Sequence, residues 1–175
     1  MKVAQIAVIG SSKLDESNKD FKLIMDLGKR LVDENYRILC GGLGGVMEAV
    51  CRGAKLSSRY REGMTVGILP SHDLNTANPY IDIKIATGMS ISRNQIIISS
   101  ADAVVSASGG SGTLSEISFA WQLGKPIISL VETGGWSEKI AGKKIDDSRK
   151  DKVHSAKNIE QVISFISEIL RSKRN

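Results

Sequence analysis

Two glycine-rich stretches, each lying between a short apolar run and a helical pattern, constrain the fold of this chain more than any other feature. Gly41–Gly45 follows the apolar run Tyr36–Cys40, and Ser108–Gly112 follows the apolar run Ala103–Ala107. An apolar run, a tight turn and an amphipathic segment in that order are typical of a parallel sheet whose strands are joined by helices. Glycines that cluster at turns also indicate special backbone geometry.

The rest of the chain repeats this alternation of strands and helices. Apolar runs predict further strands at Val3–Ile9, Thr65–Leu69 and Pro126–Val131. In Ile81–Ala86 apolar and polar residues alternate, which predicts a strand with one exposed face or at the edge of the sheet. Helical spacing predicts helices over residues 18–34, 46–56, 89–100, 113–123 and 158–170, with Ser17 and Asn158 as N-caps and Gly124 just past a helix end. Residues 132–151 are expected to form a surface loop or a frayed segment. The pattern predicts one α/β domain over residues 1–175, with a Rossmann-like, doubly wound, mainly parallel sheet and helices on both faces.

Composition disfavours several classes of protein. No apolar run approaches the roughly 20 residues of a membrane span, and residues 1–9 are too short for a signal peptide, so a cytoplasmic protein is expected. Cys40 and Cys51 match no metal or redox spacing and are expected to be small buried groups, and no metal site is predicted. The net charge of +5 lies largely in the C-terminal third among interspersed acids, which favours a solvated surface over a nucleic-acid interface.

A phosphate-binding site is predicted at the carboxyl edge of the sheet, where doubly wound proteins bind their ligands. Helix N-termini at that edge present unpaired backbone N–H groups and a partial positive charge, and glycine lets a phosphate approach them closely. The candidate ligand-binding residues are Gly10, Ser11, Gly41, Gly42, Gly44, Gly45, Thr87, Gly88, Met89, Arg93, Gly109, Gly110, Ser111, Gly112 and Thr113. The alternative is that the glycines merely make tight turns.

The two turns do not match the common nucleotide-binding motifs. In Gly42–Met47 a methionine stands where the dinucleotide fingerprint has its third glycine, and no Gly-Lys-Ser/Thr of a P-loop follows either turn. A pyridoxal phosphate enzyme needs a larger scaffold and a Schiff-base lysine that nothing marks out, so a lysine decarboxylase is disfavoured. The turns therefore predict a bound phosphate without identifying the molecule that carries it.

Arg93 and Glu116 are the candidate functional side chains. Arg93 could be a solvated surface group, or its guanidinium could clamp a phosphate at the turn 108–112. Glu116 lies three residues after Thr113, the spacing of a capping box, so its carboxylate could simply bond the backbone of Thr113. Alternatively, Glu116 could activate a water or orient ribose hydroxyls. The residues themselves leave these alternatives open.

Four segments of the chain, taken in order, carry a resemblance to a known family. They are Gly41–Val50, Ala77–Met89, Arg93–Asn94 and Ser108–Glu116. Together they resemble the molybdenum-cofactor carrier proteins and their relatives in the LOG-like group, over roughly residues 3–131. That group was once labelled "possible lysine decarboxylase" and includes cytokinin-activating phosphoribohydrolases. The resemblance implies a Rossmann-like fold and a homodimer or homotetramer.

The resemblance also implies competing activities for one site. Carriers hold a phosphorylated pterin without turnover, whereas phosphoribohydrolases cleave the N-glycosidic bond of nucleoside 5′-monophosphates such as AMP. The hydrolase signature, Pro-Gly-Gly-x-Gly-Thr-x-x-Glu after an Arg-Lys pair, maps onto this chain so that Arg93 and Glu116 would be catalytic. However, Ser108 replaces its proline and Asn94 replaces its lysine.

These two differences from the hydrolase signature decide the order in which we rank the hypotheses. The Arg93–Asn94 pair and the Gly41–Val50 turn look closer to the carriers, so binding of a molybdenum cofactor, with no further cofactor required, is the first hypothesis. Hydrolysis of a nucleoside monophosphate is the second, and a nucleotide sensor without turnover is the third.

Overall fold

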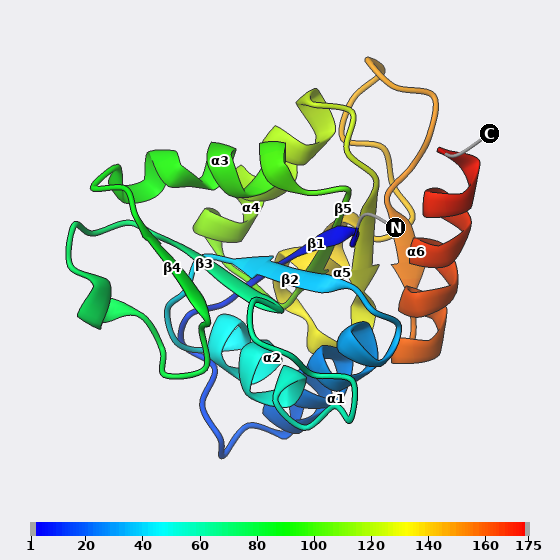
Figure 1. The fold of residues 1–175 in the computed structure, drawn as a ribbon. Helices are drawn as coiled ribbons and strands as arrows, with labels where there is room; N and C mark the ends of the chain where they lie inside the picture. The colour runs from blue at the N-terminus through cyan, green and yellow to red at the C-terminus, as the bar shows by residue number, and fades with distance from the viewer. Residues whose placement is uncertain (1–2, 174–175) are drawn as a thin grey trace.

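The computed structural model describes residues 3–173, which build a seven-stranded sheet. The strands are β1 (Gln5–Gly10), β2 (Arg37–Cys40), β3 (Thr65–Leu69), β4 (Ile83–Ala86), β5 (Ala103–Ala107), β6 (Ile127–Leu130) and β7 (His154–Ala156). Their order across the sheet is β4-β3-β2-β1-β5-β6-β7, and each neighbouring pair runs parallel (Figure 1). The predicted Rossmann-like parallel sheet is therefore confirmed.

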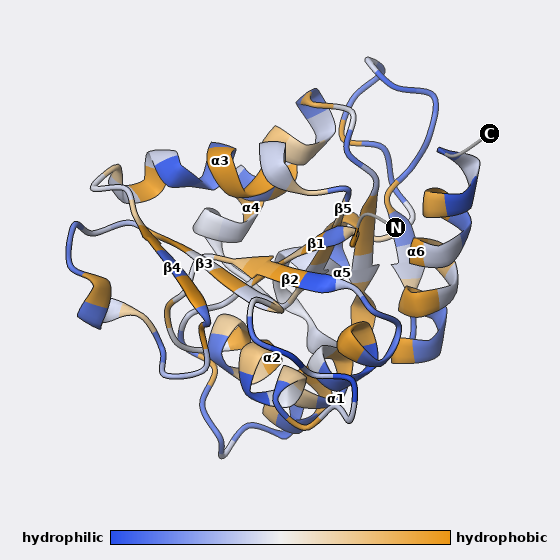
Figure 2. Cartoon of the chain, viewed as in Figure 1, coloured by the Kyte–Doolittle hydropathy of each residue, from blue (hydrophilic) through white to orange (hydrophobic). Residues whose placement is uncertain are grey.

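Helices cover both faces of this sheet. One face packs against α1 (Lys19–Asp33), α2 (Val46–Ala54) and α6 (Ile159–Ser172), and the other against α3 (Asn94–Ser100), α4 (Ser111–Gln122) and α5 (Gly135–Ile140). Successive strand residues serve opposite faces, so Ile6 and Val8 join the first apolar layer while Ala7 and Ile9 join the second. Because both faces are buried, the central strands are mainly apolar, as Figure 2 shows.

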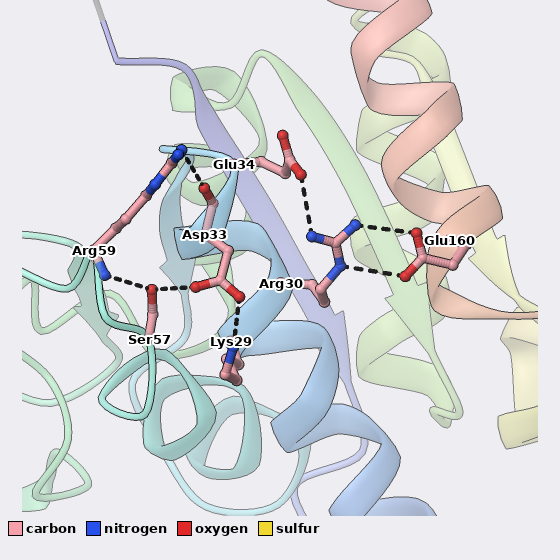
Figure 3. Close-up of polar contacts among 7 residues, drawn as sticks. All are labelled: Lys29, Arg30, Asp33, Glu34, Ser57, Arg59 and Glu160. Atoms are coloured by element: carbon pink, nitrogen blue, oxygen red, sulfur yellow. Dashed lines mark hydrogen bonds and ion pairs between the residues drawn. The ribbon is translucent and has the colours of Figure 1, made fainter.

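Polar contacts join α1 to its neighbours on the first face (Figure 3). The guanidinium of Arg30 donates to both carboxylate oxygens of Glu160 on α6, at 3.2 and 3.0 Å. At the end of α1, Asp33 accepts a hydrogen bond from Lys29 at 2.7 Å and another from the hydroxyl of Ser57 at 2.6 Å. These contacts hold α1, α2 and α6 as one layer, away from the carboxyl edge of β1.

Helix boundaries differ from the sequence predictions where side chains compete for the cap. Asn158 caps α6 and Gly124, with φ of 65°, follows α4, as predicted. The prediction of Ser17 as the cap of α1 is wrong, because its hydroxyl donates to Asp15 while the side chain of Asn18 accepts the Asp20 N–H.

The segment 132–151 is more ordered than predicted. It contains the end of a 3₁₀-turn (Val131–Thr133) and all of α5, and the strand β7 follows it. Gly134 and Gly135, both with positive φ, begin this short helix, and β7 has only three residues. Elements this short leave no periodic pattern in the sequence.

The structure also bears on the cysteines, on membrane-spanning helices and on clusters of metal-binding side chains. Cys40 and Cys51 are both buried and free, with sulfur atoms 3.8 Å apart. Within residues 3–173, no helix has both the length and the apolar character needed to cross a membrane. The same part of the chain contains no cluster of three or more His, Cys, Asp or Glu side chains that could hold a metal ion.

Candidate functional site

A cavity of about 580 Å³ opens at the carboxyl ends of β1, β2, β3 and β5. It lies where the strand order reverses, since β1 leads outward to β2 while β5 starts the other half of the sheet. Ligands bind at such switch points because the loops diverge there and leave a crevice. Of the predicted site residues, the cavity is lined by Gly10, Ser11, Gly41, Arg93, Gly110, Ser111, Gly112, Thr113 and Glu116.

Seven predicted residues are absent from the described lining: Gly42, Gly44, Gly45, Thr87, Gly88, Met89 and Gly109. The glycine turn that precedes α2 packs against the turn after β1, at Ser11. The Val46 N–H, the first of α2, donates to the carbonyl of Ser11 at 2.9 Å. A Cβ on Gly45, whose φ is 69°, would lie 2.2 Å from that same oxygen. The first N–H of α2 therefore already bonds the Ser11 turn.

The turn after β2 contributes through Gly41. A Cβ there would lie 2.3 Å from Nη1 of Arg93, so the absence of a side chain lets the guanidinium lie on the backbone of β2. Sequence reasoning missed Asn78, which holds this turn in place. Its side-chain amide donates to the carbonyls of Gly42 and Leu43, at 3.2 and 2.9 Å. The signal that could have identified Asn78 is its place in the segment Ala77–Met89, which carries the family resemblance.

Residues 87–89 brace the wall of the cavity. The hydroxyl of Thr87 donates to the carbonyl of Leu69 at 2.7 Å. Gly88, with φ of 64°, faces the ring of His72, whose Cε1 would lie 2.0 Å from an added Cβ. Met89 is exposed. Their contacts therefore support the backbone that leads to Arg93.

The N-terminus of α4 faces the cavity without a side-chain cap. Its N-cap is Gly110, no described side chain accepts a hydrogen bond from the N–H groups of its first turn, and that turn lacks an acidic residue. Ser111, Gly112 and Thr113 line the cavity, and the first N–H groups of a helix have no partner within it. A Cβ on Gly110 or Gly112 would meet none of the described atoms within 4 Å. An anion therefore has both room and donors at this end of α4.

Arg93 is a buried cation beside this helix end. It ends the 3₁₀-turn Ser90–Arg93, and only 8% of the residue is exposed, so the alternative of a solvated surface group is wrong. Among the described residues, its Nε and Nη1 atoms have no hydrogen-bond partner. Burial lowers the pKa of Arg93, and the carboxylate of Glu116 opposes that shift. The group still carries its charge at neutral pH.

Glu116 is the buried acid of the site. Its Oε1 lies 4.0 Å from Nη1 of Arg93, too far for a hydrogen bond. The capping-box alternative is wrong, because α4 begins at Ser111 and Thr113 is its third residue. Burial raises the pKa of Glu116 to about 7, and the charge of Arg93 restrains the rise. Near neutral pH this carboxyl can therefore donate or accept a proton.

Other lining residues were not predicted. Lys13, in the loop after β1, adds a second positive charge, and Leu43, Met47 and Ile91 form an apolar wall. Asn94 lines the cavity too, but its side chain donates to Ser115 at 2.9 Å and so joins α3 to α4. Lys13 could have been identified from its place directly after the Ser11 turn, whereas the apolar wall depends on tertiary packing.

Comparison with protein families gives one match over most of the chain. The model of the SLOG cluster4 family matches residues 3–163. A protein of Archaeoglobus fulgidus, described as "Uncharacterized protein", is 42% identical over 130 residues, which cover 74% of this chain and 82% of the relative.

Three solved structures are similar over nearly the full length of both chains. TM1055 is 32% identical with a TM-score of 0.86, over 95% of this chain and 99% of that one. The molybdenum cofactor binding protein of the phototrophic bacterium Rippkaea orientalis is 31% identical with a TM-score of 0.81, over 97% and 99%. The molybdenum cofactor carrier protein of Chlamydomonas reinhardtii is 28% identical with a TM-score of 0.79, over 96% and 99%.

Proposed function

The chain belongs to the SLOG cluster4 family, and from this premise we propose that it binds a phosphorylated ligand of the molybdenum-cofactor type in the cavity at the carboxyl edge of its sheet. Two of the similar structures are a binding protein and a carrier protein for that cofactor. In the proposed complex the phosphate lies against the first turn of α4, and the ring system lies on the wall of Leu43, Met47 and Ile91.

The observation that carries this proposal is the state of Arg93. Burying a guanidinium whose Nε and Nη1 find no partner among residues 3–173 is unfavourable, because each buried unsatisfied donor costs about 1–3 kcal/mol. An anion at the N-terminus of α4 would supply the missing acceptor. It would also meet the partial positive charge of the helix and the charge of Lys13.

The cavity suits a ligand with a polar and an apolar part. Its volume of about 580 Å³ lies inside the range of about 300–1,000 Å³ that small-molecule sites occupy. Its lining combines polar residues, among them Ser111 and Thr113, with the apolar side chains of Leu43, Met47 and Ile91. A phosphorylated ring compound has the matching division of surface.

Calorimetric titration with the molybdenum cofactor and with AMP tests the proposal. We expect saturable binding of the cofactor, loss of binding in Arg93→Met, and no change in Arg61→Met, which removes an exposed arginine. Tight binding of AMP without binding of the cofactor would refute the cofactor assignment, and equal binding by Arg93→Met would refute the site.

A second candidate function is hydrolysis of a nucleoside 5′-monophosphate. The observation that favours it is the pairing of Arg93 with Glu116, a carboxyl with a pKa of about 7, in the same cavity. In this alternative Arg93 supports the phosphoribosyl group, and Glu116 activates water or stabilises an oxocarbenium-like transition state. Incubation with AMP followed by detection of free adenine decides between the two functions. Release of adenine that survives in Glu116→Gln would show that this mechanism is wrong.

A further inference from the structure

The turn that leads into α4 rests on a segment from a distant part of the chain. The carbonyl of Ser108 accepts the Ser137 N–H, and the carbonyl of Gly109 accepts the Trp136 N–H, both at 3.1 Å. The Ser108 N–H donates to the hydroxyl of Thr133 at 2.6 Å. Three main-chain groups of two consecutive residues are thus bound by residues 133–137.

The two backbones also touch directly at Gly135. A Cβ at this position would lie 2.7 Å from the carbonyl oxygen of Gly109 and 2.8 Å from the carbonyl carbon of Ser108. Gly135 has φ of 64°, a conformation that residues with side chains rarely adopt. Glycine is therefore required here twice, for its conformation and for the close approach.

This segment is in turn fixed to the ends of two strands. The hydroxyl of Thr133 donates to the carbonyl of Leu130, the last residue of β6, at 2.7 Å. The hydroxyl of Ser137 donates to the carbonyl of Ser106 in β5 at 2.8 Å. Both side chains are buried. The contact is therefore a rigid clamp between the sheet and the turn.

The clamp holds a backbone conformation that the turn would not favour alone. Ser108 has φ of 57°, and the left-handed region costs a residue with a side chain roughly 1–2 kcal/mol. The direction of this residue sets where α4 begins, and therefore where the N–H groups of its first turn point. Proline cannot occupy this position in the observed conformation, since its φ is fixed near −65° and it has no N–H to give to Thr133.

We propose that Thr133, Gly135 and Ser137 are positioning residues for phosphate binding, and that the Thr133 hydroxyl sets the affinity of the α4 N-terminus for a phosphate. This inference rests on the proposed function of the cavity. Without the hydroxyl, the Ser108 N–H loses its acceptor, the turn relaxes, and the amides of Gly112 and Thr113 no longer converge with Arg93 on one anion.

The chain offers a closely matched control at Thr65. Its hydroxyl makes the same pair of bonds as that of Thr133, donating to the carbonyl of Tyr80 at 2.8 Å and accepting the Asp82 N–H at 2.9 Å. Thr65 is buried and begins β3, at the opposite edge of the parallel sheet from the cavity. Thr65→Val therefore removes a buried hydroxyl with the same kind of donor and acceptor bonds, although the Asp82 N–H keeps the carbonyl of Thr65 as an acceptor at 3.1 Å. The proposal expects no effect on binding from this change.

The experiment titrates Thr133→Val, Thr133→Ser, Thr65→Val and the unchanged protein with inorganic phosphate and records their thermal unfolding without phosphate. We expect both valine variants to lose stability, Thr133→Val more than Thr65→Val because it leaves the Ser108 N–H without an acceptor. Only Thr133→Val should bind phosphate about tenfold more weakly, the equivalent of one hydrogen bond. Thr133→Ser retains the hydroxyl and should bind phosphate normally.

Two results would contradict the inference, and they are distinguishable. If the unchanged protein binds phosphate but Thr133→Val binds it as well as Thr65→Val does, the clamp has no positioning role while the proposed function stands. If the unchanged protein does not bind phosphate at all, the proposed site fails and the inference fails with it.

Discussion

Arg93 keeps two nitrogen atoms buried and, among the described residues, without hydrogen-bond partners, which lowers the stability of the ligand-free protein. Replacing Arg93 with methionine retains much of the side-chain volume and removes the unsatisfied donors. We therefore expect the free energy of unfolding of ligand-free Arg93→Met at pH 6 to exceed that of the unchanged protein by roughly 1–3 kcal/mol. In urea denaturation, the variant should accordingly unfold at a higher urea concentration. A clear loss of stability would show that Arg93 is a structural residue.

Glu116 makes stability depend on pH. Its pKa rises from an ordinary value of 4.5 to about 7 on folding. The stabilising contribution of the protonated carboxyl is complete below pH 4.5 and is lost as the pH rises through 7, because the folded state must then ionise a buried group. The loss amounts to about 3 kcal/mol.

Urea denaturation at pH 5 and at pH 8 measures this loss. Glu116→Gln cannot ionise, so its stability should fall less over that range, whereas Glu62→Gln, an exposed control, should behave like the unchanged protein. A fall in Glu116→Gln as large as in the unchanged protein would mean that another group titrates.

At the scale of single residues, the sequence identified the candidate groups Arg93 and Glu116 but not their burial or their protonation. Arg93 and Glu116 were found because they follow turns at the ligand edge and match a family signature. Their burial and the 4.0 Å between them depend on how the 3₁₀-turn and α4 meet, which no local pattern encodes. Asn78 was missed because its hydrogen bonds join turns that are far apart in the sequence, whereas Lys13 directly follows the Ser11 turn and could have been identified.

The first turn of α4 is the element on which the proposed phosphate binding depends. An alanine methyl at Gly112 would stand in open space in front of the free amides, while alanine favours a helix over glycine by about 1 kcal/mol. We expect Gly112→Ala to be at least as stable as the unchanged protein but to bind phosphate several-fold more weakly in calorimetric titration. Ser118→Ala, on the same helix away from the described cavity lining, is the control, and equal affinities in the two variants would contradict the assignment.

The strands β1 to β6 were predictable because five are largely apolar segments next to a turn and β4 alternates apolar and polar residues before Thr87-Gly88. Two of the failures share one cause. β7 has three residues and α5 has six, so neither repeats a pattern often enough to be seen. α4 starts two residues before the prediction, at Ser111, and this small shift is what removes the capping box between Thr113 and Glu116.

The edge strand β4 and the turn that follows it carry exposed apolar side chains beside the cavity, and Figure 2 shows apolar residues along β4. Ile83, Ile85, Met89 and Ile91 are exposed there, and Ile91, at 78% exposure, also lines the cavity. Exposed apolar side chains on an edge strand are typical of an interface between subunits. The homodimer or homotetramer implied by the family resemblance is expected to form through this surface and to narrow the mouth of the cavity.

Light scattering after size-exclusion chromatography tests this expectation. The unchanged protein should elute as a dimer or larger assembly and Ile85→Lys as a smaller species. Leu56→Lys alters another exposed apolar residue and should leave the assembly unchanged. A monomeric unchanged protein, or an Ile85→Lys variant with the original mass, would rule out association through β4.

At the scale of the molecule, the fold class and the family resemblance are both confirmed, since the sheet is doubly wound and the family match extends from residue 3 to residue 163. A single phosphate-binding domain over residues 1–175 stays a prediction. The sequence suggested that the glycine turns after β2 and β5 would both offer amides to one anion. The fold brings both turns to the cavity but uses the amide end of α2 to hold the Ser11 turn.

A structure from crystals grown with inorganic phosphate tests the site most directly. We expect a phosphate whose oxygens accept the N–H groups of Gly112 and Thr113 and a hydrogen bond from the guanidinium of Arg93. A cavity without phosphate at saturating concentration, or a phosphate bound elsewhere while Arg93 stays unpaired, would contradict the assignment of this cavity as an anion-binding site.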